Sequence, residues 1–101
     1  MGSRLELQYK LEEFLESENV YYQPPESVKM KYPAIKFSKS GVSTKKANDV
    51  IYSKNTRYEL IVISNKPDHP VIDKLLSLPY CSYDRQYKAD NLYHDVLTLY
   101  Y

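Results

Sequence analysis

The sequence predicts a single α+β domain over residues 1–101, in which two helices pack on an antiparallel or mixed β-sheet in the order α-β-β-β-α-β-β. Several short runs alternate apolar and polar residues, which is typical of half-buried strands. Two other stretches repeat apolar residues at helical spacing. The last ten residues contain no glycine or proline and are rich in aromatic and β-branched types, so we expect the chain to end on a paired strand.

Two segments carry the helical pattern. Residues 3–18 are expected to form an amphipathic helix, and Ser3 with Glu6 has the spacing of a capping box. Its apolar stripe consists of Leu7, Leu11, Phe14 and Leu15. The second helix is expected to begin at Pro70 and to end before Pro79, because proline is tolerated in a first turn and cannot continue a helix. We expect its core-facing residues to be Val71, Ile72, Leu75, Leu76 and Leu78.

Five segments are predicted to be strands, at residues 19–23, 34–38, 57–65, 80–88 and 92–101. Residues 57–65 are apolar on one face and mostly apolar on the other, which indicates a central strand covered on both sides over part of its length. The last two segments should pair antiparallel through a turn at Asp90 and Asn91, which are common turn residues. Simple alternation in residues 80–88 predicts one face with Cys81, Tyr83 and Tyr87, and another with Ser82, Asp84 and Gln86.

Residues 39–56 are expected to form a long polar loop, because they exceed the usual length of a hairpin connection. Long loops in compact domains are commonly functional, so we predict that this loop contacts a partner. The residues proposed for that contact are Lys39, Lys45, Lys46, Lys54 and Arg57. A flexible, solvated loop is the simpler alternative. A nucleic acid or an acidic protein surface is the partner chemistry that the lysines would favour.

Composition restricts the function classes. The net charge of +1 is far from that of a general polyanion binder. The two glycines cannot make a glycine-rich phosphate loop. Cys81, the single cysteine, cannot form an intramolecular disulfide or a thiolate metal cage, and we expect it to be a small core residue. We expect no signal peptide, membrane contact, metal or cofactor, since the sequence has no long apolar run and no ligand cluster.

Candidate catalytic residues are few. His94-Asp95 is similar to the ligand pair of HD-type phosphohydrolases, but in a strand the two side chains point to opposite faces. His69, or Asp68 beside it, fits a helix cap better than a metal site. We therefore expect a protein that is not an enzyme. A small hydrolase or nuclease that uses Asp84, Asp90 and Asp95, brought together across the last hairpin, is the enzymatic alternative.

The aromatic residues are strongly biased, with twelve tyrosines, two phenylalanines and no tryptophan. Tyrosine combines an apolar ring with a polar tip, which suits surfaces that are partly wet and partly buried against another protein. Ordinary strand preference explains part of the bias. We predict that Tyr21, Tyr22, Tyr100 and Tyr101 lie at a sheet edge used for oligomerisation.

Three segments resemble a small structural protein of tailed phages and prophages of Gram-positive bacteria. They are VYYQPPESVKMKYPAI (residues 20–35), LLSLPYCSYDR (residues 75–85) and ADNLYHDV (residues 89–96). The element order is similar to that of the tail terminator and tail completion (neck) family, an analogy of fold order.

The resemblance implies a homo-oligomer, a hexameric ring when assembled, that caps the tail tube. It implies the tail tube protein and the head–tail connector protein as partners, passing contact with DNA in the lumen, and a place in the virion after assembly in the host cytoplasm. A head completion, connector or minor capsid protein is the alternative within the same class.

Overall fold

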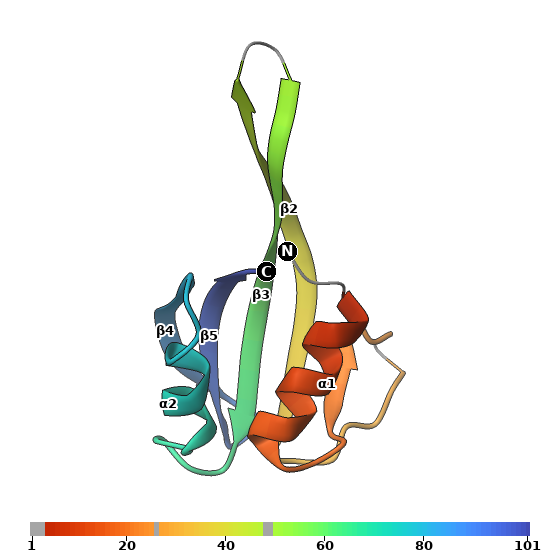
Figure 1. Ribbon diagram of the computed structural model, residues 1–101. Helices are drawn as coiled ribbons and strands as arrows, with labels where there is room; N and C mark the ends of the chain where they lie inside the picture. Colours follow the sequence, from red (N-terminus) through yellow and green to blue (C-terminus); the bar gives the residue numbers. More distant parts are fainter. Residues whose placement is uncertain (1–3, 26, 48–49) are drawn as a thin grey trace.

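The computed structural model describes residues 4–25, 27–47 and 50–101, and the side chains of these residues outside 42–55. Two helices and five strands follow one another in the order expected for the α+β class (Figure 1). They are α1 (Arg4–Leu15), β1 (Val20–Tyr22), β2 (Ala34–Ala47), β3 (Val50–Ser64), α2 (Val71–Leu76), β4 (Cys81–Ala89) and β5 (Leu92–Tyr100).

The five strands form one mixed sheet in the order β1-β2-β3-β5-β4. β1 runs parallel to β2, and the other neighbours are antiparallel. β3 lies in the middle, as its two apolar faces predicted. Asp90 and Asn91 have φ values of 52° and 63°, so the predicted turn between β4 and β5 is a two-residue turn of the kind that matches strand twist.

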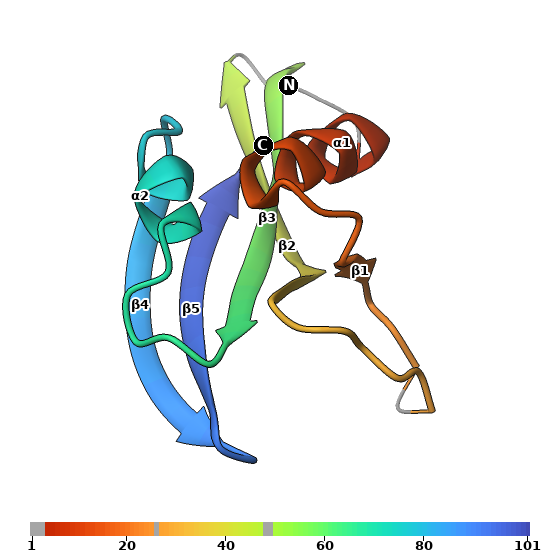
Figure 2. The same ribbon diagram turned by 90° about the horizontal axis from the view of Figure 1, so that it is seen from below.

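Both helices lie on the same face of the sheet (Figures 1 and 2). The predicted stripe of α1 is buried at Leu7, Leu11 and Leu15, and Phe14 packs at its margin. α2 contributes Val71 and Leu75 to the same cluster. The expected cap residue Ser3 lies outside the described residues. The sheet completes this core with Ile35, Phe37, Tyr58, Leu60, Val62, Leu97 and Leu99.

The prediction of a loop over residues 39–56 is wrong. β2 continues to Ala47 and β3 begins at Val50, and the two strands pair along their length from Ala34↔Ile63 to Ala47↔Val50. We call residues 41–47 and 50–56 the arm. Figure 1 shows the arm extending beyond the helices and the other strands, which we call the body. A two-stranded ribbon outside the body has no face against the core, so its sequence shows no apolar alternation.

The predicted alternation of β4 is also wrong in its second half. Tyr83 pairs with Leu97 and Arg85 with Val96, so Asp84 is an extra residue in a β-bulge. The bulge reverses which residues face the helices. Tyr83 and Gln86 therefore lie on the helix-covered face, while Tyr87 lies beside His94 on the opposite face.

Candidate functional site

The arm leaves the body where the outer strands stop pairing with it. β1 pairs with β2 only over Ile35–Phe37, and β5 pairs with β3 only from Arg57 onwards. Among the residues that the structure describes, the arm strands pair with each other and with no third strand, apart from one backbone hydrogen bond from Tyr101 to Thr56 at the base of the arm. Seven residues per strand reach roughly 20 Å at the rise of a β-strand, in keeping with principal extents of 51 × 26 × 23 Å. The arm thus presents two open strand edges.

The base of the arm is fixed by hydrogen bonds around a second β-bulge. The register shifts between Lys39 and Gly41, which leaves Ser40 as the extra residue. The Arg57 side chain bonds to Ser40 twice, from Nε to Oγ at 3.1 Å and from Nη2 to the carbonyl oxygen at 3.0 Å. Gly41 leaves room for this guanidinium, because an added Cβ would lie 3.1 Å from Nη2. The Tyr101 N–H donates to the Thr56 carbonyl at 3.0 Å.

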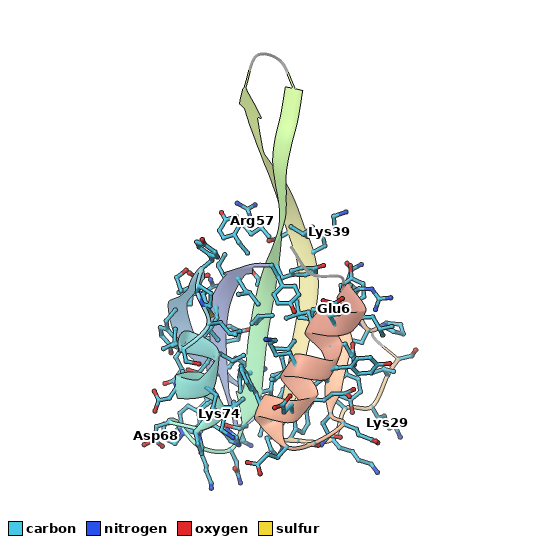
Figure 3. The ribbon with its side chains drawn as sticks, viewed as in Figure 1. Glu6, Lys29, Lys39, Arg57, Asp68 and Lys74 are labelled. Carbon is cyan, nitrogen blue, oxygen red and sulfur yellow. The ribbon has the colours of Figure 1, made fainter. Side chains whose placement is uncertain are left out.

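The predicted basic residues lie on the two strands of the hairpin rather than on a loop. Lys39 and Arg57 are exposed and lie on either side of the arm base (Figure 3). Lys45 and Lys46 belong to β2 and Lys54 to β3, where the backbone register pairs Lys45 with Ser53 and Thr44 with Lys54. The side chains of these three lysines lie outside the described part of the chain. Their role in partner contact remains a prediction.

The predicted edge tyrosines are divided between two kinds of strand. Tyr21 and Tyr22 are on β1, which is an edge strand of the sheet. Tyr100 is on β5, which lies between β3 and β4, so an edge position for Tyr100 is wrong. Tyr101 follows β5, and the role of these tyrosines in oligomerisation remains a prediction. The edge strand at this end of the sheet is β4, which pairs with β5 after the tight turn. Tyr100 and Tyr101 are half-buried.

Tyr80 is an exposed aromatic residue that the sequence analysis missed. Its side chain is 78% exposed, and its φ of 67° is in the left-handed region that favours glycine. Its carbonyl accepts the Tyr100 N–H at 3.1 Å, which fixes it beside the end of β5. Because Tyr100 pairs with Arg57, Tyr80 lies at the same end of the body as the arm base. The left-handed backbone could not be inferred from the neighbouring Pro79.

A second feature is a pocket of about 300 Å³ between α2 and the last two strands. Its lining combines carboxylates, a histidine and apolar side chains: Pro67, Asp68, His69, Ile72, Asp73, Leu76, Tyr83 and Asp95. Asp68 lies at the end of the body away from the arm (Figure 3). The sequence does not reveal this pocket, because its lining residues come from a connection, a helix and two strands.

Asp95 is the buried polar group of the pocket, with 2% of its surface exposed. Its Oδ1 accepts hydrogen bonds from the Tyr83 hydroxyl at 2.6 Å and from Gln86 Nε2 at 2.9 Å. Its Oδ2 is buried and has no hydrogen-bond partner within the described residues. The bond to Asp95, reinforced by burial, raises the pKa of Tyr83 to about 12. Gln86 also donates to the Pro67 carbonyl at 2.7 Å, which ties the connection before α2 to β4.

His69 acts as a cap at the start of α2, as predicted. Its Nδ1 accepts the Val71 N–H at 3.1 Å, an arrangement that requires the neutral ring. Burial lowers the pKa of His69, and the charges of Lys66 and Lys74 lower it further, against a raising effect of Asp95. The ring therefore adds no positive charge to the pocket near neutral pH.

The residues considered for catalysis do not converge. His94 stacks on Tyr87 at 4.8 Å between ring centroids, on the face opposite Asp95, as expected for neighbours in a strand. Asp84 accepts a hydrogen bond from Thr98 Oγ1 at 2.7 Å at the bulge, and Asp90 is in the turn, so the three carboxylates do not form a site.

The described residues also bear on two other kinds of site, a metal site and a reactive cysteine. Within residues 4–25, 27–47 and 50–101, no group of three or more His, Cys, Asp or Glu side chains is arranged to hold a metal ion. Cys81 is half-buried against the core, and burial, followed by the charge of Asp84, raises its pKa to about 11. A thiol with this pKa is a poor nucleophile near neutral pH.

No protein-family model matches the chain, and no curated protein matches it. In the described part of the chain, no helix is long and apolar enough to cross a membrane.

Proposed function

We propose that this chain is a non-enzymatic structural protein of a tailed phage that acts at the head–tail junction, as a tail terminator or tail completion protein. The observation that carries the proposal is the arm, a two-stranded ribbon whose outer edges have no partner strand among the described residues. An isolated hairpin is at best marginally stable in water, and open edges readily pair with another chain. A protein that works by fitting against other proteins would need such an extension.

The charge along the hairpin supports contact with an acidic surface. Residues 39–57 contain five cationic residues and one acidic residue, in a chain whose net charge is +1. The tail tube protein and the head–tail connector protein are the proposed partners, and DNA passing through the lumen is a further one. The resemblance to tail terminator proteins implies a hexameric ring, and a heterologous interface that closes on itself gives cyclic symmetry of that kind.

A shortened arm tests the proposal. Replacing residues 43–55 by Asn-Gly keeps the Val42–Thr56 pair and all pairing of the body, so the variant is expected to fold. In the phage or prophage that encodes the chain, this variant should give tails of abnormal length, or tails that fail to join heads, in the electron microscope. The control replaces Lys45, Lys46 and Lys54 by Gln, which removes charge and keeps the arm.

Two outcomes decide between the candidates. Tails of normal length that join heads efficiently with the shortened arm would reject the role of the arm. Labelling of the protein at the portal side alone, in purified particles, would favour a head completion, connector or minor capsid protein instead. Genes for a portal, a head–tail adaptor and a tail tube beside the gene for this chain would support the whole class.

A further inference from the structure

We propose that the pocket between α2 and the last two strands binds the cationic end of a basic side chain, an arginine guanidinium or a lysine ammonium, with the carboxylate of Asp95, which lines the pocket, as its acceptor. This inference does not rest on the proposed function. It starts from one atom, a buried carboxylate oxygen without a donor among the described residues. Such atoms are rare in folded proteins, because burying a charged acceptor without a hydrogen bond is strongly unfavourable.

The carboxylates that line the pocket favour a cation. Asp68 and Asp73 line the pocket with Asp95, and both are exposed enough to attract a ligand from solvent. His69 is held neutral by its bond to the Val71 N–H. Lys74 is directed away, since its Nζ bonds to Glu16 Oε2 and to the Phe14 carbonyl, each at 3.2 Å. A neutral or anionic ligand would leave these carboxylates uncompensated.

The apolar lining favours a cation on a hydrocarbon stem rather than a bare ion. Ile72 and Leu76 of α2, the Pro67 ring and the Tyr83 ring line the space beside the carboxylates. Leu76 is 40% exposed and Tyr83 43%, so both offer free apolar surface. Lysine and arginine bury their stems against such surface while the charge reaches a polar partner. A volume of about 300 Å³ is sufficient for one side chain of this size.

The direct test is a titration of the full chain, followed by ¹H–¹⁵N NMR at low salt. The probes are Nα-acetyl-arginine methylamide, Nα-acetyl-lysine methylamide and the neutral citrulline analogue. We expect saturable shifts for residues 67–76, Tyr83 and Asp95 with the two cations, with dissociation constants on the order of 1 mM, and none with citrulline. Equal shifts with citrulline, or no saturation with either cation, would overturn the proposal and leave water as the partner of Oδ2.

Variants locate the acceptor. Asp95→Asn should weaken binding of the arginine probe about tenfold or more, because it removes the charge that the cation meets. Asp84→Asn is the matched control, a carboxylate in the same hairpin that bonds to Thr98 instead, and should leave binding unchanged. If Asp95→Asn fails to fold, the variants Asp68→Asn and Asp73→Asn, at exposed residues, provide the test. Their affinity for the arginine probe is expected to fall about threefold. Unchanged binding in every folded variant would overturn the assignment.

A second measurement identifies the source of the cation. The arm of another copy carries lysines, and it extends from the end of the body opposite Asp68 (Figure 3). Self-association in sedimentation that is lost both in Asp95→Asn and in the Lys45→Gln, Lys46→Gln, Lys54→Gln variant would assign the cation to a second copy. A chain that binds the arginine probe and remains monomeric would assign it to a different protein.

Discussion

The hydroxyl of Tyr83 should be worth more to stability than its exposure suggests, and Tyr83→Phe tests this. The hydroxyl donates at 2.6 Å to Asp95, whose side chain is almost completely buried. Hydrogen bonds to charged groups contribute about 1.5–3 kcal/mol, against about 1 kcal/mol for neutral ones. After the substitution, Oδ1 keeps one donor, Gln86 at 2.9 Å. We expect a loss of about 2 kcal/mol, near the lower end because Tyr83 is partly exposed.

Tyr87→Phe is the matched control, because it removes a hydroxyl from the same strand at nearly the same exposure, 41% against 43%. The Tyr87 ring stacks on His94, and within the described residues its hydroxyl makes no hydrogen bond. Phenylalanine keeps the stacking, so we expect a change below about 0.5 kcal/mol. The contrast between the two variants isolates the bond to Asp95.

Urea denaturation measures both free energies of unfolding, and thermal denaturation provides a check. A loss of about 2 kcal/mol corresponds to a fall in Tm of roughly 8–15 °C for a domain of this size. In an Asp95→Asn background, the cost of Tyr83→Phe should shrink by about 1 kcal/mol, because the acceptor is then neutral. Equal effects of Tyr83→Phe and Tyr87→Phe would refute the reasoning.

Three further outcomes are expected. Folding raises the pKa of Tyr83 to about 12, so the folded state holds this proton more tightly than the unfolded state. The free energy of unfolding should therefore fall as the pH rises from 10 to 12. In urea denaturation, Tyr83→Phe should show a shallower fall over the same range. Because the pKa of Cys81 is raised to about 11, its thiol should react with a disulfide reagent at pH 8 about 100-fold more slowly than glutathione, and at a normal rate in urea; a native rate within threefold of glutathione would contradict this. The effect of Gly41→Ala on the free energy of unfolding should be more favourable by about 1 kcal/mol in an Arg57→Ala background than in the parent chain, because the added methyl group then meets no guanidinium. Equal effects in both backgrounds would show that the guanidinium does not lie against Gly41.

The body of the fold could be predicted because burial leaves a pattern in the sequence. Leu7, Leu11 and Leu15 repeat at helical spacing, since α1 buries one stripe. Tyr58, Leu60 and Val62 alternate along β3 because this face packs in the core under the helices. The same rule explains why the arm was mistaken for a loop. Its strands pair with each other beyond the core, so no side of the ribbon requires apolar residues at every second position.

The candidate pocket was beyond prediction for a different reason. Its position depends on the bulge at Asp84, which is one extra residue in a strand and reverses the facing of every residue after it. Without the bulge, Gln86 would face away from Asp95 and could not donate to it. Sequence alternation assigns faces by counting, so it fails as soon as one residue is left unpaired. The clue that was available is the single carboxylate among the apolar residues of β5.

That carboxylate is the strongest sign that the pocket has a use. The next positions of β5 on the same face are Leu97 and Leu99, which are fully buried. A leucine at position 95 would bury its side chain without an unpartnered oxygen, and apolar replacements of buried charges are often neutral or stabilising. Folding accounts for Oδ1, which accepts hydrogen bonds from Tyr83 and Gln86, but it gives no reason for the second buried oxygen, Oδ2. Residues that contradict the local rules of a stable core are expected at functional sites, where a ligand supplies the missing interaction. The Oδ2 atom of Asp95 is such a case, and the proposed cation would supply the donor that it lacks.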